Sequence, residues 1–451
     1  MCGIIGVYSK DTVPVSKKLF YGLNSLQHRG QESAGITVSD GEQIKRHRAM
    51  GLVMDVFKSE EDLSSLQGNL GIGHVRYSTS GGVSELNIQP LIGFVKDESI
   101  AISHNGNLVN YHVLRSRLEE EGMMFQTKID TEVILYLIAR YYSGDIVSAI
   151  QRTMDRIEGA YSVILQLKDR IVAFRDPYGF RPLVLGQDGE DYIVSSENAA
   201  VEIIGGSMLR NVAPGEIVVI DEGGVHSYFY EKKAPRKNCV FEYVYFARND
   251  ANLDDVNAYN FRRRCGEILW EEKPLDVDLV IPVPDSGIPS AIGFAQASGI
   301  PFGEGLVKNR YMGRTFIKPT QKERDMAVKL KLNPLVEVVE GKRIVLLDDS
   351  IVRGTTSKNL IQRLRDAGAK EVHMRITSPP VKYSCYYGID TPNRNNLIAA
   401  HHSVEEMEEI IGADSLAFIS LEGLAKAGKK DLDQFCTACF SGDYPVDPTL
   451  I

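Results

Sequence analysis

Two adjacent acidic residues follow a short apolar run in the stretch "RIVLLDDSIVRGTTSKNLIQRL". The apolar run predicts a buried strand of a parallel sheet, and Asp348 and Asp349 stand at its carboxyl end. Carboxylates in that position can hold ribose hydroxyls or a hydrated magnesium ion, because ligands of open α/β sheets bind at the carboxyl ends of the strands. The sequence therefore predicts a ligand site at this edge of a sheet.

The turn that follows these acids has the composition of a phosphate-binding loop. The residues that would offer backbone amides and hydroxyls to an anion are Arg353, Gly354, Thr355, Thr356 and Ser357. An amphipathic helix follows the turn, so a phosphate would meet these groups at the positive end of that helix. The plainer alternative is a helix N-cap beside a solvated pair of aspartates.

A cysteine stands directly after the initiating methionine in "MCGIIGVYSK". Once Met1 is removed, the α-amine of Cys2 lies on the same residue as the thiol, so a nucleophile and a base arrive together. An unperturbed α-amine titrates near about 8 and a thiol near about 8.5, which makes proton transfer between them easy near neutral pH. The alternative for any single cysteine is a buried thiol without a chemical role.

Four of the six cysteines have the number and type needed for a metal centre. Cys436 and Cys439 form the pair "CTAC", whereas Cys239 and Cys385 lie far upstream. Four thiolates suit an iron-sulfur cluster or zinc, and the spacing does not choose between these two or a redox-active pair. Cys265, in the helical stretch "FRRRCGEILW", has no such companion and is expected to be a small buried side chain.

The elements that must position these residues fall into two halves, joined near residue 235 by the polar stretch "EKKAPRKNC". In the first half, short β-rich stretches between turns predict antiparallel sheets, and one long helix is predicted through "TEVILYLIARYYSGDIVSAIQRTMDRI". In the second half, apolar runs followed by helical segments predict βαβ units on a parallel sheet. We therefore predict two domains, residues 2–234 and 235–451.

Length and charge limit the class of protein. A chain of 451 residues is too long for one ordinary core. Its 51 Lys plus Arg against 60 Asp plus Glu give a net charge of -9, which argues against nucleic acid or an anionic membrane as the main partner. No apolar run approaches the roughly 18 residues that span a bilayer, and the start lacks the features of a secretory signal. We expect a cytoplasmic enzyme.

One segment departs from this acidic character. The stretch "KNRYMGRTFIKPTQKERDMAVKLK" carries eight basic and two acidic residues in 24. A basic segment between two phosphate-binding loops predicts a flap that closes over a polyanionic ligand and excludes water. A nucleic-acid patch and a solvated basic surface are the alternatives.

The stretch around Asp348 closely resembles the phosphoribosyl pyrophosphate loop of type I phosphoribosyltransferases, and "VIPVPDSGIPSA" resembles the pyrophosphate-contacting loop of the same family. The resemblance implies that Asp348 and Asp349 contact the ribose and its magnesium. Residues 350–357, from Ser350 to Ser357, are implied to hold the 5-phosphate. Asp285 and Ser286 are implied to lie near the pyrophosphate and the metal.

Five stretches of the first half together resemble the glutamine amidotransferase domain of the N-terminal nucleophile hydrolase superfamily. They are "LQHRGQES", "GHVRYSTSG", "SHNGNLVN", "KIDTE" and "FRDPYGFRPL", and the match spans most of residues 2–230. The resemblance implies that Cys2 attacks the side-chain amide of glutamine. It further implies that Asn105 and the Gly106 amide form the oxyanion hole.

The same resemblance assigns the ends of the substrate. Arg76 is implied to hold the carboxylate of glutamine, which suits the bidentate grip of a guanidinium, and Asp130 is implied to hold its ammonium group. Arg29 is placed with these glutamine-binding residues as a support of the same loop. His28, His74 and His104 flank the motifs and are expected to be structural, because the terminal amine already supplies a base.

Joined in one chain, the two halves resemble the glutamine phosphoribosylpyrophosphate amidotransferase family along essentially the whole length. The resemblance implies an αββα sandwich followed by a parallel-sheet phosphoribosyltransferase domain with a helical tail. It implies that glutamine, water and phosphoribosyl pyrophosphate yield 5-phosphoribosylamine, pyrophosphate and glutamate, the first committed step of purine synthesis. The resemblance also implies a homotetramer inhibited by purine nucleotides, which would compete for the loops around Asp348 and the basic segment.

Family resemblance also bears on the cysteines. One branch of the family carries a structural four-iron cluster, which implies that Cys239, Cys385, Cys436 and Cys439 are ligands of a 4Fe-4S cluster that holds the carboxyl-terminal tail to the domain boundary.

Three other classes of protein share part of these features. They are an amidotransferase that makes an amino sugar or asparagine, a nucleotide-sensing regulator without activity, and a structural iron-sulfur protein. The phosphoribosyl loop argues against the first, and the intact glutaminase set argues against the second.

Overall fold

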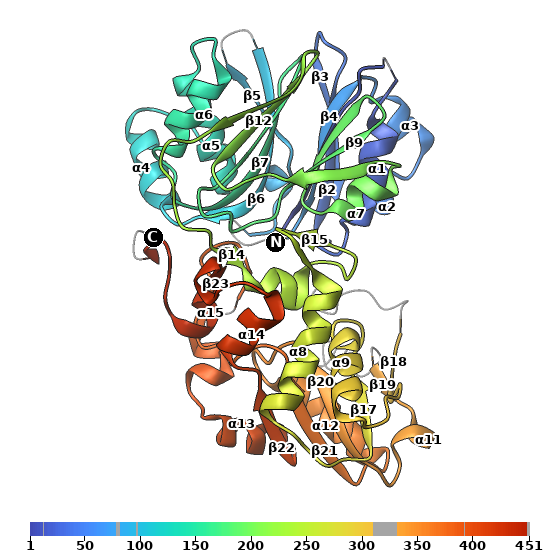
Figure 1. Cartoon of the computed structure of the whole chain (residues 1–451). Helices are drawn as coiled ribbons and strands as arrows, with labels where there is room; N and C mark the ends of the chain where they lie inside the picture. The colour runs from blue at the N-terminus through green and yellow to red at the C-terminus, as the bar shows by residue number, and fades with distance from the viewer. Residues whose placement is uncertain (12, 78–81, 96–97, 310–331, 392, 449–451) are drawn as a thin grey trace.

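The computed structural model describes residues 1–11, 13–77, 82–95, 98–309, 332–391 and 393–448. Figure 1 shows two lobes, one built from β1 to β13 and the other from β14 to α15, with the N terminus at the junction between them. Within the described residues, no helix is long and apolar enough to cross a membrane.

Two sheets, one of seven strands and one of six, form the first lobe. The seven-stranded sheet has the order β11-β9-β10-β1-β4-β2-β3 and the six-stranded sheet the order β13-β12-β8-β7-β6-β5. The strands of the first are β1 (Gly3–Tyr8), β2 (Ser33–Ser39), β3 (Ile44–Met50), β4 (Leu70–Arg76), β9 (Val184–Asp188), β10 (Asp191–Ser195) and β11 (Ser207–Asn211). The strands of the second are β5 (Leu91–Val95), β6 (Glu98–Leu108), β7 (Gly159–Gln166), β8 (Ile171–Arg175), β12 (Glu216–Asp221) and β13 (Gly224–Phe229).

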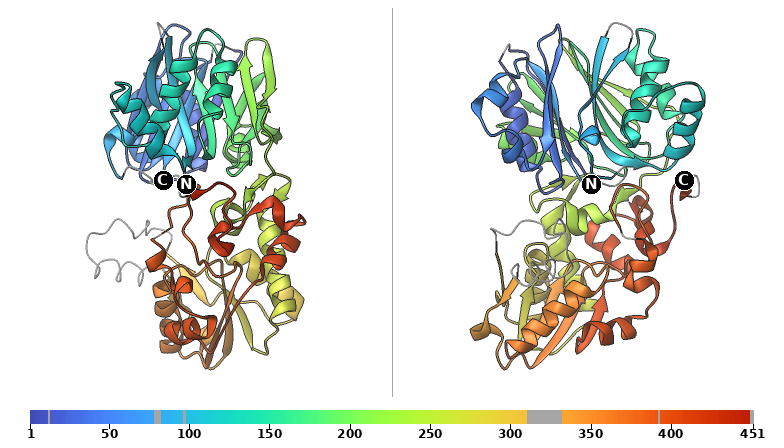
Figure 2. Two further views of the ribbon diagram at one scale, coloured as in Figure 1. Left: turned by 90° about the vertical axis from the view of Figure 1, so that its left-hand side faces the viewer. Right: turned by 180° about the vertical axis from the view of Figure 1, so that it is seen from behind.

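Helices cover the outer faces of both sheets (Figure 2). On the first sheet these are α1 (Ser16–Ser25), α2 (Val53–Val56), α3 (Glu60–Ser64) and α7 (Asn198–Ile203), and on the second α4 (Tyr111–Glu120), α5 (Asp130–Tyr141) and α6 (Ile146–Met154). Ile4, Ile72, Ile164 and Val218 belong to the apolar cluster between the two sheets, and each is fully buried. The predicted αββα sandwich is confirmed.

The single long helix predicted in this domain is wrong. The stretch folds as two helices, α5 ending at Tyr141 and α6 beginning at Ile146. Gly144 between them has a φ of +115°, and the Asp145 side chain accepts a hydrogen bond from the Val147 N–H as the N-cap of α6. The prediction of one helix followed from the helical periodicity on both sides, although the residues "SGD" form a turn between them.

A four-stranded parallel sheet in the order β17-β20-β21-β22 lies at the centre of the second lobe. Its strands are β17 (Leu279–Pro282), β20 (Arg343–Asp348), β21 (Glu371–Ile376) and β22 (Ser415–Phe418). The helices around it are α8 (Ala258–Glu272), α9 (Ile288–Ser298), α11 (Val336–Val339), α12 (Thr355–Asp366) and α13 (Val404–Ile411). Leu360, Ile361 and Leu364 of α12 are buried, as its amphipathic pattern predicts. The predicted parallel-sheet domain is confirmed.

Shorter elements complete the second lobe. β18 (Leu306–Lys308) pairs with β19 (Leu332–Pro334), and β15 (Asn252–Leu253) with β16 (Val256–Asn257). The 3₁₀ segments outside the sheets are Glu85–Asn87 in the first lobe and Arg394–Asn396, Ile398–Ala400 and Leu432–Gln434 in the second. The predicted basic flap lies almost entirely at residues 310–331, outside the described residues.

The connection between the lobes is tied to the carboxyl-terminal tail. β14 (Asn238–Cys239), directly after the predicted boundary at residue 235, pairs in parallel with β23 (Phe435–Cys436). A π-helical segment η2 (Glu242–Phe246) follows β14, and the tail contains α14 (Leu421–Gly428) and α15 (Ala438–Ser441). The pairing brings residues from opposite ends of the second half together at the lobe junction.

Candidate functional site

Cys2 lies at the lobe junction, one residue before β1, and its backbone N–H donates a hydrogen bond to Asn105 Oδ1 at 3.1 Å. The Cys2 Sγ atom is 3.7 Å from the Tyr77 carbonyl oxygen. Asn105 is fully buried in β6, and its Nδ2 group has no hydrogen-bond partner among the described residues. A buried amide donor left unpaired is costly, so this group is available to an oxygen that arrives with a ligand.

Arg29 holds Cys2 from the other side. Its Nε donates to the Cys2 carbonyl oxygen at 3.0 Å, and its two terminal nitrogens form ion pairs with Glu197 at 2.5 Å and Glu242 at 2.8 Å. The guanidinium is fully buried. Burial alone would lower the pKa of Arg29, but the two carboxylates raise it above its usual value. All of these contacts are internal, so the geometry makes Arg29 a support of Cys2 rather than a group facing a substrate.

Arg76 ends β4 beside this site. Its guanidinium pairs with Glu32 and donates to the Gly82 carbonyl oxygen at 3.1 Å. Its side chain is 4% exposed and that of Glu32 is 15% exposed, so the pair is largely withdrawn from solvent. Arg76 therefore already holds one carboxylate in a buried setting, which is the chemistry that an amino-acid carboxylate needs.

Asp130 begins α5 and faces the strand that carries Asn105. Its carboxylate accepts a hydrogen bond from the Leu108 N–H at 2.9 Å and lies 3.4 Å from His104 Nδ1. Burial raises the pKa of Asp130, but the facing His104 and the backbone N–H groups of Leu108 and Thr131 together hold that pKa below its usual range. Asp130 is thus an anion at neutral pH within a buried environment.

The flanking histidines have partners inside the protein. His28 Nε2 lies 2.8 Å from Glu197, and His74 Nε2 lies 3.2 Å from the His104 carbonyl oxygen. Burial lowers the pKa of His74 to about 3, which keeps this side chain neutral. These contacts agree with the structural roles predicted for them.

Met1 is present in this chain and is 1% exposed. Burial lowers the pKa of its α-amine to about 5. The sulfur of Met1 lies 2.6 Å from Arg181 Nη1. With Met1 in place, the nitrogen of Cys2 is an amide, so the geometry above describes the site before the methionine is removed.

A second site lies at the carboxyl edge of the parallel sheet. β17 and β20 are parallel neighbours, so the residues that follow them meet at this edge. The hydroxyl of Ser286 donates to Asp349 Oδ2, and the Ser350 hydroxyl donates to Asp349 Oδ1 at 2.5 Å. Asp348 accepts the Asp349 N–H at 2.9 Å. The structure thus brings Ser286 next to the consecutive residues Asp348, Asp349 and Ser350, although Ser286 lies 63 positions before Asp349 in the chain.

The electrostatics of this edge favour a cation. Burial and the charge of Asp349 raise the pKa of Asp348 well above its usual range, and burial raises that of Asp349. A positive ion would offset the cost of ionising these two carboxyl groups. The oxygen atoms at this edge are the ligand type that magnesium prefers. Asp285, which follows β17 and is 63% exposed on its side chain, instead pairs with Lys308 of β18.

The turn after Ser350 leads through a left-handed glycine into α12. Gly354 has a φ of +76°, a left-handed conformation that suits glycine, and α12 begins at Thr355. Thr355 and Thr356, at the start of this helix, are exposed, whereas Ser357 is buried. Arg353, which precedes the turn glycine, is also exposed. The first amides of a helix have no partner within it, so they point at whatever lies above the turn.

Four cysteine side chains line one enclosed cavity at the junction. The lining residues are Cys239, Cys385, Cys436 and Cys439 with Phe180, Arg181, Tyr387, Ile389 and Ala438. The parallel pairing of β14 and β23 sets Cys239 directly opposite Cys436. Burial raises the pKa of Cys239, Cys436 and Cys439, so without a metal these thiols are neutral. All six cysteines of the chain are free of disulfides, and Cys265, at 1% exposed, lies in the core as predicted.

Comparisons with known proteins agree with this geometry. A family model for a glutamine amidotransferase domain matches residues 74–202. Amidophosphoribosyltransferase from Methanocaldococcus jannaschii is 47% identical over 465 residues, covering 99% of this chain and 98% of the relative. The chain belongs to the amidophosphoribosyltransferase family. The Bacillus subtilis amidophosphoribosyltransferase is 45% identical over 451 residues, covering 99% of this chain and 94% of the relative.

A solved amidophosphoribosyltransferase structure has the same fold. Glutamine phosphoribosylpyrophosphate amidotransferase from B. subtilis, complexed with ADP and GMP, superposes with a TM-score of 0.93 at 44% identity, covering 99% of this chain and 98% of that one. The predicted function is confirmed: the chain is a glutamine-dependent amidophosphoribosyltransferase of purine biosynthesis.

Several residues of this amidophosphoribosyltransferase escaped the sequence analysis. Glu197 and Glu242 hold Arg29, Arg181 borders the cysteine cavity, and Lys308 pairs with Asp285. Glu242 lies 213 positions from Arg29 in the chain. Arg181 stands inside the motif "FRDPYGFRPL", whereas Glu242 and Lys308 were marked only by position, Glu242 because it follows Cys239 closely and Lys308 because it opens the basic segment.

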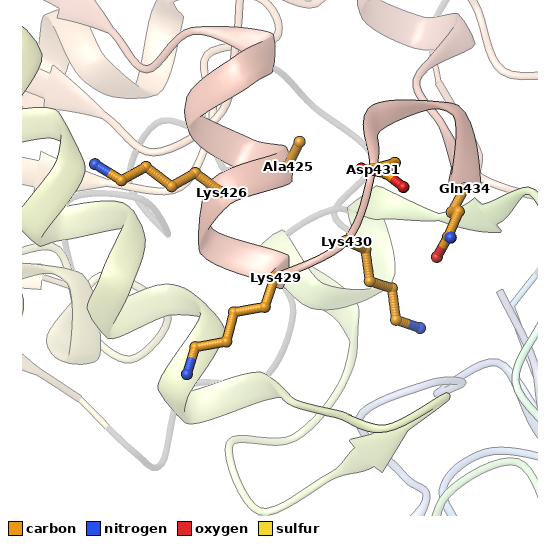
Figure 3. A pocket seen from close by; sticks show the side chains of 6 residues that line it. All are labelled: Ala425, Lys426, Lys429, Lys430, Asp431 and Gln434. Carbon is orange, nitrogen blue, oxygen red and sulfur yellow. The ribbon is translucent and has the colours of Figure 1, made fainter.

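Figure 3 shows a further pocket of the second lobe. Its lining residues are Ala425, Lys426, Lys429, Lys430, Asp431 and Gln434, at the end of α14. Lys426 pairs with Glu271 at 2.7 Å, and Lys430 donates to the Asp254 carbonyl oxygen. None of the predicted site residues lines this pocket.

Proposed function

We propose that Cys2 is the nucleophile that releases ammonia from glutamine. The observation that carries this assignment is Asn105, whose Oδ1 is engaged by the Cys2 nitrogen while its buried Nδ2 is unpaired among the described residues. That arrangement leaves one donor for the oxygen of a tetrahedral intermediate, and the Gly106 N–H would be the second. After Met1 removal, the Cys2 amine would take the thiol proton and later deliver it to the leaving ammonia.

Glutamine would be held by its own charged ends. The carboxylate would replace Glu32 on Arg76, and the ammonium would pair with Asp130, which is ionised at neutral pH. The thioester formed at Cys2 would then be hydrolysed by water, which gives glutamate. Arg29 would act indirectly by fixing the carbonyl of Cys2.

The second site would bind phosphoribosyl pyrophosphate. Asp348 and Asp349 would contact the ribose, the turn of residues 350–357 would hold the 5-phosphate, and Asp285 with Ser286 would face the pyrophosphate. Magnesium would fit the oxygen donors of Ser286, Asp348 and Asp349. Its positive charge would lower the raised pKa values of the two aspartates. When bound, magnesium neutralises charge on the leaving pyrophosphate. Ammonia from Cys2 would attack C1 of the ribose as pyrophosphate departs.

The cysteine cavity suits an iron-sulfur cluster. Four thiols line one cavity, and four thiolates are the donor set of either a 4Fe-4S cluster or zinc. The family resemblance favours the cluster over zinc. Arg181 beside Cys239, Cys385 and Cys436 would offset the negative charge of such a centre.

Three further properties stay predictions. Purine nucleotides are proposed as inhibitors that compete near Asp348 and the basic segment; the B. subtilis relative in complex with ADP and GMP supports this. A homotetramer and a cytoplasmic location are also proposed, the first from family resemblance and the second from sequence composition.

One incubation tests the proposed function. Protein purified without oxygen is mixed with glutamine, magnesium and phosphoribosyl pyrophosphate, and glutamate and pyrophosphate are measured. We expect the two products to appear in equal amounts. Glutamate without pyrophosphate would contradict the assignment of the second site, and pyrophosphate without glutamate would contradict that of the first.

A second experiment tests the cluster. We expect anaerobically purified protein to be brown with about four irons per chain, and air to remove both iron and activity. Replacing any of the four lining cysteines by serine should destabilise the fold, because ligation ties distant segments together. Cys265→Ser is the matched buried control and should retain iron. Colourless, active protein with stoichiometric zinc would overturn the cluster.

A further inference from the structure

A segment of the second domain packs against the strand that carries the proposed oxyanion donors. The segment is residues 385–388, "CYYG", and the strand is β6. Asn107 Nδ2 donates to the Tyr386 carbonyl oxygen at 2.9 Å, and Arg181 Nε donates to the Tyr387 carbonyl oxygen at 2.9 Å. Two consecutive carbonyls of this segment are therefore bound by side chains of the first domain.

The next residue, Gly388, reaches the backbone of Gly106. Gly388 has a φ of +102°, and a Cβ placed on it would lie 3.0 Å from the carbonyl carbon and 3.1 Å from the carbonyl oxygen of Gly106. On Gly106 itself, a Cβ would lie only 2.0 Å from the Ala160 carbonyl oxygen of β7. The Gly106 backbone is thus confined between β7 and Gly388.

The segment has little freedom to move. The Tyr387 ring stacks on Phe180 with centroids 4.5 Å apart and planes 17° apart. The Tyr387 hydroxyl donates to the Val446 carbonyl oxygen at 2.6 Å and accepts from the Val446 N–H at 2.9 Å. Tyr387 is 1% exposed. Tyr387, which is buried and makes two hydrogen bonds with Val446, therefore fixes the position of Gly388 beside Gly106.

We propose that Gly388 is a positioning residue for glutamine hydrolysis, and that the second domain completes the oxyanion hole by fixing the Gly106 peptide. The inference rests on the proposed role of Gly106. Oxyanion donors act only when they lie about 2.7–3.1 Å from the developing charge, so a side chain at position 388 that shifts Gly106 removes part of their effect. The Cys2 thiol lies against the Tyr77 carbonyl oxygen at 3.7 Å and should keep its reactivity.

The test is Gly388→Ala in the full chain, with three readouts. We expect kcat for glutamine hydrolysis to fall about 10- to 100-fold with little change in KM. Synthesis of phosphoribosylamine from external ammonia should be unchanged. Alkylation of Cys2 by iodoacetamide, followed by peptide mass mapping, should also be unchanged, since this reaction forms no oxyanion. Iron content reports whether the neighbouring Cys385 is disturbed.

Gly368→Ala is the matched control. Gly368 has a similar φ of +90°, and a Cβ there would meet the flexible Glu340 side chain at 3.0 Å, far from β6. We expect this variant to keep all three readouts.

A second variant approaches the same contact from the first domain. Asn107→Ala removes the bond to Tyr386 and should lower kcat in the same direction but less. The double variant should lose less than the product of the two single effects, because both act on one contact. If Gly388→Ala does not fold, Asn107→Ala decides alone.

Two results would overturn the proposal. One is unchanged glutamine hydrolysis in Gly388→Ala and Asn107→Ala. The other is an equal loss of the glutamine-dependent and ammonia-dependent reactions, because a contact that acts on Gly106 leaves the phosphoribosyl site intact. Failure of the proposed function has a different signature: the unmodified protein itself would release no glutamate.

Discussion

Cys2→Ala should abolish glutamine-dependent synthesis while high ammonium at alkaline pH still yields phosphoribosylamine. The substitution removes the proposed nucleophile, and the contacts among Ser286, Asp348 and Asp349 lie in the other domain. Loss of a covalent nucleophile typically removes several orders of magnitude in rate. Phosphoribosylamine formation with each nitrogen source gives the measurement.

The control for this variant is Cys265→Ala, which removes a buried thiol outside the proposed site and should use both nitrogen sources. Intact mass of the unmodified protein should show that active chains begin at Cys2. Full activity of chains that retain Met1 would contradict the terminal-amine mechanism, and glutamine-dependent synthesis by Cys2→Ala would contradict the role of the thiol.

The double change Asp348→Asn with Asp349→Asn should lose synthesis from both nitrogen sources. It removes two carboxylates whose pKa burial raises, that of Asp348 being raised further by the charge of Asp349, and it therefore removes the charge that would hold magnesium and ribose. Lost positioning and electrostatic help cost orders of magnitude in rate. Pyrophosphate release is measured with glutamine and with ammonia, and basal glutamine hydrolysis should persist.

Asp276→Asn with Asp278→Asn provides the matched control, because both residues pair with Arg343 at the opposite end of β20. This variant should retain synthesis. Normal use of ammonia by the Asp348 and Asp349 variant would show that these acids do not hold the acceptor.

Local pattern was enough to predict most of the site-bearing elements. The apolar run before Asp348 forms β20, and the turn at Gly354 opens α12, because strand, turn and helix signals all lie within one short stretch. The break between α5 and α6 was missed because both flanks share a helical period, and only the short "SGD" turn distinguishes two helices from one.

Long-range pairings were beyond the reach of local pattern. Arg29 stands in a motif that suggests substrate binding, yet its carboxylate partners come from α7's N-cap Glu197 and from Glu242 in the second half. A buried ion pair costs desolvation that only well-placed partners repay, and a single sequence carries no sign of which partners those are. Gly388 is hidden for the same reason, since its neighbour Gly106 lies in the other domain.

The pairing of β14 with β23 sets an order for assembly during synthesis. The first domain and β14 leave the ribosome well before Phe435 and Cys436, and domains emerging first generally fold first. The cavity lined by Cys239 and Cys439 cannot form until that late strand has been made. The hydrogen bonds between Tyr387 and Val446 also have to wait for this part of the chain. If Gly388 positions Gly106 as proposed, a nascent chain that already displays Cys2 would still lack this support, so glutamine hydrolysis would be slower until the domain that consumes the ammonia has been made.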